Sequence, residues 1–296
     1  MTDAANTLET RRQATLIGAG AVFPWGSLAI LTRLTGDVPP FQMVAIAFAV
    51  GFFIALIKWI LCGESVPRHF RQPLRAWALG IVGLFGYHFL IFTALKTAPP
   101  VEANLVNYLW PLLIVIFSAL LPGETLRTRH IAGALVGFAG VYLLVTGGAS
   151  IRPDTAHLPG YAAAFLAALL WSSYSVASSR LENVPTDAIG AFCLVAGVLS
   201  VVAHLVFETT VHPSSGEWLA LIALGLGPAG GAFFLWDWGL KRGSVRALGG
   251  IAYCAPLLST GLLLAFGAGT LTPAIAIAAI AIVAGAALAA GDMFGR

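Results

Sequence analysis

The chain has 296 residues, of which 58% are hydrophobic and only 10% are charged, and its mean hydropathy is +0.88. Soluble domains carry about 25% charged residues, so this composition excludes an ordinary soluble protein and indicates a polytopic membrane protein. The net charge of +3 is too small to indicate a nucleic-acid partner.

Ten apolar segments follow one another along the chain, each of roughly the length that crosses a bilayer. Their approximate limits are 13–32, 41–61, 74–96, 101–121, 129–146, 160–180, 188–208, 217–240, 245–266 and 273–291. Short connections rich in proline and glycine join them, and none is long enough to hold a folded soluble domain. The first segment is too long for the apolar region of a secretory signal, so we expect a membrane helix there.

The basic residues favour one orientation across the membrane. With the N-terminus in the cytoplasm, 13 of the 16 Lys and Arg residues fall on the inner side, and only Arg33, Lys96 and Arg152 fall outside. Positive charge accumulates on the cytoplasmic side of membrane proteins. We therefore expect the N-terminal segment 1–12 and the C-terminal segment 292–296 to be cytoplasmic.

The second half of the chain repeats the first at an offset of 145 or 146 residues. The paired positions include Lys96 with Lys241, Tyr108 with Tyr253, Pro111 with Pro256 and Trp25 with Trp171. Chance matching in a biased composition is the alternative, but several ordered matches at nearly one offset favour a repeat. Five helices per repeat is an odd number, so the second repeat is inverted relative to the first. We divide the chain into repeats 13–146 and 160–291, joined by an extracytoplasmic linker 147–159, with a substrate site near the midplane between them.

Polar side chains at membrane depth are costly and usually mark a pathway or a site. In the first segment, Pro24-Trp25-Gly26-Ser27 predicts a bend, with Trp25 either packed between helices or beside a pathway. In the third segment, Tyr87 and His88 lie near mid-span. We expect His88 to face a cavity, and the alternative is a hydrogen-bonded core histidine.

The fourth segment carries Asn104, Asn107, Tyr108 and Pro111 at spacings that place them on one helix face, with Trp110 on the neighbouring face. Amides at such positions can simply hold helices together. The added aromatic rings favour a binding surface, because flat rings stack on apolar ligands and bind cations.

The sixth segment repeats this spacing with Trp171, Tyr174, Ser175 and Ser178, and Trp171 is too deep for an interfacial aromatic belt. In the eighth segment Pro228 predicts a bend, and Asp237 either pairs with Lys241 four residues later or serves as an acid for proton coupling. The ninth segment carries Tyr253 and Pro256, the repeat partners of Tyr108 and Pro111.

The fifth and tenth segments lack such groups and carry small residues at four-residue spacing, which permits close helix packing. These are Gly133 and Gly137, then Ala281, Gly285 and Ala289. They predict a scaffold or a dimer face, in a monomer or a homodimer. The chain has no GxxxxGK[ST] motif for ATP and no HExxH motif, and its three cysteines lack metal-ligand spacing, so we expect neither cofactor nor metal.

Ten helices in two inverted five-helix repeats resemble the drug/metabolite transporter superfamily, EamA type, over nearly the whole chain. The run from Asn107 to Pro111, followed by Gly123-Glu124, is similar to the fourth helix of that family and its terminal Gly-Glu. Gly86-Tyr87-His88 together with Tyr108-x-Trp110-Pro111 is most similar to the bacterial aromatic amino acid exporters of the superfamily. The second repeat departs from the pattern, because Gly269 stands where Glu124 would match.

This resemblance implies export of amino acids, hydrophobic and aromatic ones foremost, through a central cavity in the bacterial inner membrane. We expect a secondary transporter that works by alternating access, with a small-molecule substrate and a lipid bilayer as its partners, and no enzyme activity. The residues expected at the substrate are Tyr87, His88, Asn107, Tyr108, Trp110, Trp171, Tyr174 and Tyr253, with bends at Pro24, Pro111, Pro228 and Pro256. A multidrug or cationic-metabolite exporter of the same architecture is the alternative. A membrane-embedded enzyme is disfavoured by the lack of a metal or carboxylate cluster in the sequence.

Overall fold

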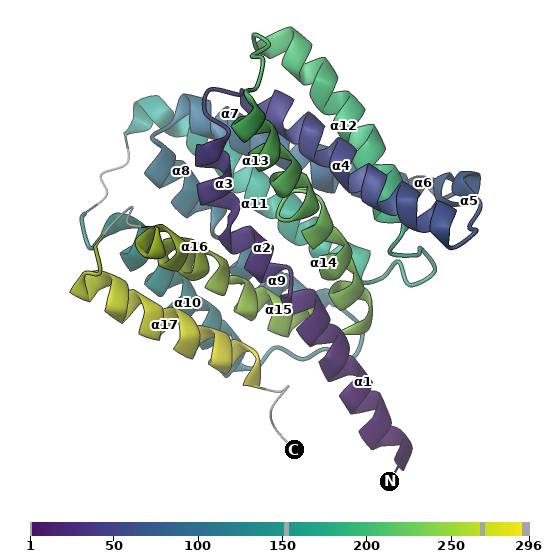
Figure 1. Ribbon diagram of the computed structural model, residues 1–296. Helices are drawn as coiled ribbons and strands as arrows, with labels where there is room; N and C mark the ends of the chain where they lie inside the picture. Colours follow the sequence, from purple (N-terminus) through teal and green to yellow (C-terminus); the bar gives the residue numbers. More distant parts are fainter. Residues whose placement is uncertain (1, 151–153, 267–269, 292–296) are drawn as a thin grey trace.

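A computed structural model of the chain describes residues 2–150, 154–266 and 270–291 (Figure 1). Within these ranges the chain forms helices and connecting turns, without a β-strand. Nine helical spans in the described ranges are long and apolar enough to cross a membrane, and a shorter apolar helix, α17 (Pro273–Ala289), follows them. Arg152, Gly269 and the C-terminal segment 292–296, which carried expectations from sequence, lie outside the described residues.

Most spans of the first half are divided into shorter helices. The elements are α1 (Thr2–Ala19), α2 (Val22–Gly26), α3 (Leu28–Leu34), α4 (Pro40–Leu61), α5 (Val66–Phe70), α6 (Leu74–Ile81), a π-helical turn (Val82–Gly86), α7 (Tyr87–Thr97), α8 (Pro100–Asn107), α9 (Trp110–Phe117) and α10 (Thr128–Thr146). The helix over the first span already begins at Thr2, so the N-terminal segment extends it.

The second half contains two undivided spans followed by two divided ones. The elements are α11 (Leu158–Ser178), α12 (Ala188–Phe207), α13 (Ser215–Leu226), α14 (Gly231–Arg242), α15 (Val245–Ala252), α16 (Cys254–Ala265) and α17.

The interruptions recur at the spacing of the sequence repeat. The π-helical turn begins at Val82, and the break between α13 and α14 begins at Gly227, 145 residues later. Likewise α8 begins at Pro100 and α15 begins at Val245, again 145 residues apart. Glycine loosens both broken regions, and Pro228 removes a backbone donor from the second. The two halves therefore share their breaks as well as their sequence pattern.

Corresponding helices of the two halves run antiparallel. Lys58 near the end of α4 pairs with Asp187 at the start of α12, whereas Glu208 after α12 accepts hydrogen bonds from Phe41 and Gln42 at the start of α4. Figure 1 shows this pair at the upper right. Glu208 thereby accepts from backbone amide groups that the start of α4 would otherwise leave unpaired.

The helices α10 and α17 form a second antiparallel pair, at the lower left of Figure 1. A Cβ added at Gly133 would lie 2.6 Å from the backbone nitrogen of Ala289, and one at Gly285 would lie 2.5 Å from the backbone nitrogen of Gly137. The small residues thus allow backbone contact within the chain. This stripe, expected to be a scaffold or a dimer face, is occupied by the chain's own helices.

Glu124 fastens the loop after α9 to two distant helices. Its carboxylate pairs with Arg11 in α1, and its other oxygen lies 3.2 Å from a guanidinium nitrogen of Arg246 in α15. Arg246 also donates to the carbonyl of Thr125 at 2.6 Å. Glu124, just after the fourth span, therefore has a structural role.

Candidate functional site

Four tryptophans from four different spans meet in the interior of the molecule. Trp25 of α2 lies 6.0 Å from Trp110 of α9, 6.1 Å from Trp171 of α11 and 5.0 Å from Trp236 of α14, measured between ring centroids. Trp110 is also within 6.4 Å of Trp171 and 6.1 Å of Trp236. All five contacts are edge-to-face, the arrangement that the charge distribution of aromatic rings favours. We call these residues the tryptophan cluster.

The breaks in the helices help to hold this cluster in place. The indole nitrogen of Trp25 donates to the carbonyl of Pro228 at 3.1 Å, and this carbonyl belongs to the break between α13 and α14. The indole nitrogen of Trp236 donates to the hydroxyl of Ser175 at 3.1 Å. A membrane interior offers few spare acceptors, so each bond fixes the orientation of its ring.

Tyr87 and Asn107 form a polar pair beside the tryptophan cluster. The Tyr87 ring lies 5.3 Å from the ring of Trp171, and its hydroxyl oxygen accepts a hydrogen bond of 3.2 Å from the Asn107 amide. Asn107 is the last residue of α8 and is 6% exposed. Among the described residues its side-chain oxygen has no hydrogen-bond partner. Leaving a buried acceptor unpaired costs about 1–3 kcal/mol, so this oxygen is a natural place for a ligand donor.

His88 lies next to Tyr87 and is surrounded by aromatic rings. Its Nδ1 donates to the carbonyl of Leu84 at 2.7 Å, so in the neutral form Nε2 remains an acceptor. The centroids of Phe48 and Phe233 are 5.2 Å and 6.3 Å from the imidazole. The sequence left open a cavity-facing histidine or a hydrogen-bonded core histidine, and the structure contains the hydrogen bond of the second alternative with one ring nitrogen still available.

Asp237 forms a buried ion pair with Lys241. The carboxylate oxygen lies 2.8 Å from the ammonium nitrogen, and the two side chains are 2% and 5% exposed. Lys241 also donates to the carbonyl of Val184 at 2.9 Å. This is the i, i+4 pairing that the sequence offered as one of two alternatives, and it gives Asp237 a structural partner.

Two predicted site residues lie elsewhere. Tyr253 is fully buried in a separate group of side chains with Val115 and Ile282, and Tyr108 packs against the same group. The ring of Tyr253 occupies the space above Gly137 of α10. Tyr108 and Tyr253, which are partners in the sequence repeat, thus pack against one group of side chains beside α10 and α17, outside the tryptophan cluster.

The remaining predicted residues lie at the cluster or at breaks. Tyr174 packs 5.2 Å from Trp171 and covers Gly83 in the π-helical turn. Pro111 follows the break at Tyr108, and Pro256 follows the break at Tyr253. Pro228 lies within a break, whereas α2 continues through Pro24 and the first span is interrupted on either side, before Val22 and at Ser27.

Trp25, which the sequence left open between helix packing and a pathway, lies at the centre of the cluster. The aromatic residues that sequence reasoning did not connect with the site at all are Trp236, Phe233 and Phe48. Trp236 and Phe233 follow the Gly-Pro break of the eighth span, and that break was the available signal. Phe48 lies in an unbroken apolar helix with only apolar neighbours in sequence, so nothing in the sequence separates it from a lipid-facing phenylalanine.

Comparison with protein families decides the class. The model of the EamA-like transporter family matches residues 13–146 and, a second time, residues 158–291. The chain belongs to the EamA-like transporter family. It is therefore a multi-pass membrane protein.

This EamA-like transporter is similar to proteins named as exporters. It is 50% identical over 283 residues to the aromatic amino acid exporter YddG of Ancylobacter novellus, covering 95% of this chain and 98% of the relative. The exporter of the same name from Salmonella typhimurium is 26% identical, covering 86% of this chain and 88% of the relative. A solved crystal structure, 49% identical, superposes with a TM-score of 0.91 over 96% of this chain and all of that one.

Proposed function

We propose that this EamA-like transporter exports aromatic and other neutral amino acids across a bacterial inner membrane, and that the substrate binds at the tryptophan cluster. The meeting of Trp25, Trp110, Trp171 and Trp236 beside the unpartnered oxygen of Asn107 carries the proposal. The similarity to relatives named aromatic amino acid exporters supports it.

The chemistry of the site suits a zwitterion with an apolar side chain. Indole walls provide stacking surfaces, worth about 0.5–1.5 kcal/mol for each aromatic pair beyond area burial. The Asn107 oxygen and His88 Nε2 are acceptors for the ammonium group. The Tyr87 hydroxyl accepts from Asn107, so its own proton is free for the carboxylate.

The proposed topology has ten membrane helices in two inverted repeats, 13–146 and 160–291, with the linker 147–159 outside and both termini in the cytoplasm. Breaks that recur 145 residues apart support the repeat. The antiparallel course of α4 against α12 and of α10 against α17 supports its inversion. The tenth span is then α17, which is shorter than the other nine.

Transport by alternating access requires the cluster to open to each side in turn. The breaks near Pro24, Pro111, Pro228 and Pro256 supply the bends for this motion, and Tyr108 and Tyr253 lie at two of them. The packed pair α10 and α17 is the frame against which the broken helices move.

The decisive experiment is counterflow in proteoliposomes. Liposomes that contain the purified protein and are loaded with unlabelled phenylalanine or tryptophan should accumulate the labelled amino acid without ATP. The Trp171→Ala substitution should abolish this uptake. The matched control is Trp218→Ala, because Trp218 is 43% exposed on α13, outside the cluster. Folded protein that moves no amino acid would refute the proposal.

A multidrug or cationic-metabolite exporter is the competing function, because an aromatic cluster also binds cations. Coupling of such exporters to protons calls for a buried acid, and Asp237 is already paired with Lys241. The same liposomes, offered a quaternary ammonium compound against a pH gradient, distinguish the two. Uptake of the cation in place of the amino acids would favour the competing function.

A further inference from the structure

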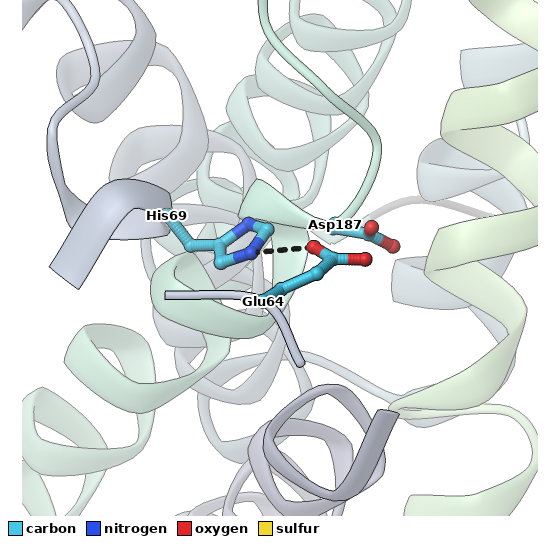
Figure 2. Close-up of side chains that lie close together, drawn as sticks. All are labelled: Glu64, His69 and Asp187. Atoms are coloured by element: carbon cyan, nitrogen blue, oxygen red, sulfur yellow. Dashed lines mark ion pairs between the residues drawn. The ribbon is translucent and has the colours of Figure 1, made fainter. Parts of the chain in front are cut away.

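A second cluster of side chains that could bind a ligand lies just beyond the C-terminal end of α4, outside the tryptophan cluster. It contains Glu64 from the turn after α4, His69 from α5 and Asp187 from the start of α12 (Figure 2). One potential ligand atom from each residue lies within 4.8 Å of the other two. Transport does not use these residues in the proposal above.

His69 is the unusual member of the cluster. It is 3% exposed, and its ring stacks on Trp59 with a centroid distance of 4.2 Å and an interplanar angle of 3°. Its Nε2 lies 2.9 Å from a Glu64 oxygen, yet this contact lacks hydrogen-bond geometry. Figure 2 marks this ion pair with a dashed line. Neither ring nitrogen has a hydrogen-bond partner among the described residues. A buried imidazole without a hydrogen-bond partner, next to two carboxylates, is an available metal ligand.

The cluster already attracts positive charge. The ammonium of Lys58 pairs with Asp187, and it lies 3.6 Å from a Glu64 oxygen. The Lys58 side chain is 47% exposed, so it can swing into solvent and leave both carboxylates to another cation. Glu64 and Asp187 are 29% and 25% exposed, which gives them room to move toward a shared ion.

We propose that Glu64, His69 and Asp187 bind a divalent transition metal of the zinc class, with water as the fourth ligand. One imidazole nitrogen and two carboxylate oxygens form a ligand set that suits zinc, whereas magnesium and calcium prefer oxygen alone. Zinc–ligand distances of about 2.0–2.2 Å place tetrahedral ligands about 3.4 Å apart. The widest separation in the cluster, which is within 4.8 Å, therefore has to close, whereas His69 Nε2 and the Glu64 oxygen, now 2.9 Å apart, have to separate slightly.

The proposed ion would link the two halves of the chain. Glu64 and His69 belong to the first half of the chain and Asp187 to the second. A shared ion would join the α4–α5 turn to the start of α12 and would stabilise the folded protein by mass action.

Zinc titration of the purified full-length protein in detergent tests the inference. We expect one equivalent of bound zinc by elemental analysis, a rise in Tm with zinc, and a visible absorption band of four-coordinate geometry when Co²⁺ replaces zinc. Magnesium at the same concentration should produce none of these effects.

Variants identify the ligands. Glu64→Gln and Asp187→Asn should each weaken zinc binding at least tenfold, and so should His69→Gln if the protein folds. Lys58→Met should strengthen binding roughly tenfold, because it removes the competing charge. The controls are His212→Gln, an exposed histidine after α12, and Cys62→Ser, an exposed thiol near Lys58.

Three results would overturn the inference. Zinc binding that disappears in Cys62→Ser or His212→Gln but survives in Glu64→Gln and Asp187→Asn would assign the ion to an unrelated group. Binding that weakens in Lys58→Met would show that the ammonium does not compete with the metal. A lack of zinc binding by the folded wild type would also exclude the site.

Discussion

Half of the Asn107 amide, beside the tryptophan cluster, is unused. Its nitrogen donates to Tyr87, whereas its buried oxygen lacks a hydrogen-bond partner within the described parts of the chain. A residue selected for stability alone would not keep an unsatisfied acceptor, since its desolvation weakens the fold. The arrangement is therefore more consistent with substrate binding than with helix packing.

If Asn107 binds substrate, its substitution should lower transport while leaving the thermal stability almost unchanged. Asn107→Leu should lower amino acid counterflow roughly 10- to 100-fold, the loss expected for a hydrogen bond to a charged group of about 1.5–3 kcal/mol. The Tm should change little, because the substitution also removes the unsatisfied oxygen. Counterflow and thermal unfolding are measured on the same preparation, with Asn104→Leu, one turn earlier on α8, as the control. An equal transport loss in the control would contradict the assignment to Asn107.

The buried ion pair of Asp237 and Lys241 should stabilise the fold. Lys241→Met should destabilise the protein by about 3–5 kcal/mol, because it leaves a carboxylate buried without its partner. The double variant Asp237→Leu, Lys241→Met should recover much of that loss and should still transport amino acids if the pair is structural. Thermal unfolding and counterflow of both variants and of the wild type provide the measurement. A stable double variant without transport would assign Asp237 to coupling.

At the scale of helices, α10 and α17 pack closely because glycine at the contact lets the two backbones approach each other. The Cβ positions of Gly133 and Gly285 are filled by the opposing backbone. Lipid provides no hydrophobic driving force between helices, so close packing has to supply the attraction. Any side chain that separates these backbones should loosen the frame of the molecule.

Gly285→Val should therefore lower the Tm of the detergent-solubilised protein, with a cost of about 1–3 kcal/mol or more from overpacking. The matched control is Gly261→Val in α16, where an added Cβ meets no atom within 4 Å. Both substitutions change helix propensity alike, so their difference isolates the steric effect. Equal Tm values for the two variants would show that the α10–α17 contact is not close in solution.

The sequence predicted the helical elements well, because a run of apolar residues of bilayer length has few alternative structures. The expected segments 101–121 and 129–146 match the observed spans Pro100–Leu120 and Thr128–Thr146 closely. The breaks were only partly anticipated. Proline marks those near Pro111, Pro228 and Pro256, whereas the π-helical turn at Val82–Gly86 contains no proline. Glycine in an apolar helix more often permits packing than a change of helix type, so its signal was ambiguous.

The candidate site was harder to predict. Helical spacing in the sequence shows which residues share one face of a helix, but it does not show what that face contacts. Tyr253 matches Tyr108 in the repeat, and the structure packs both beside α10 and α17. Trp236 enters the cluster from a segment whose sequence drew attention to Asp237. Such contacts join residues far apart in sequence, for example Trp25 and Pro228, and no local pattern contains them.

At the scale of the whole molecule, the direction of the helices constrains the topology. The end of α4 lies by the start of α12, and the start of α4 lies by Glu208, which follows α12. The turn after α4 and the loop after α12 are therefore at opposite ends of this helix pair. Across a membrane they face opposite compartments, and the basic residues favour the cytoplasm for the turn after α4.

Labelling with a membrane-impermeant maleimide tests this arrangement. Cys62, exposed in the turn after α4, should react only in permeabilised cells, whereas His212→Cys in a Cys62→Ser background should react in intact cells. The Cys62→Ser protein alone gives the residual labelling of Cys193 and Cys254. Reaction of both positions from the same side would contradict inverted repeats. Reaction of Cys62 alone in intact cells would keep the inversion and reverse the orientation, because the antiparallel course of α4 and α12 is independent of which end faces the cytoplasm.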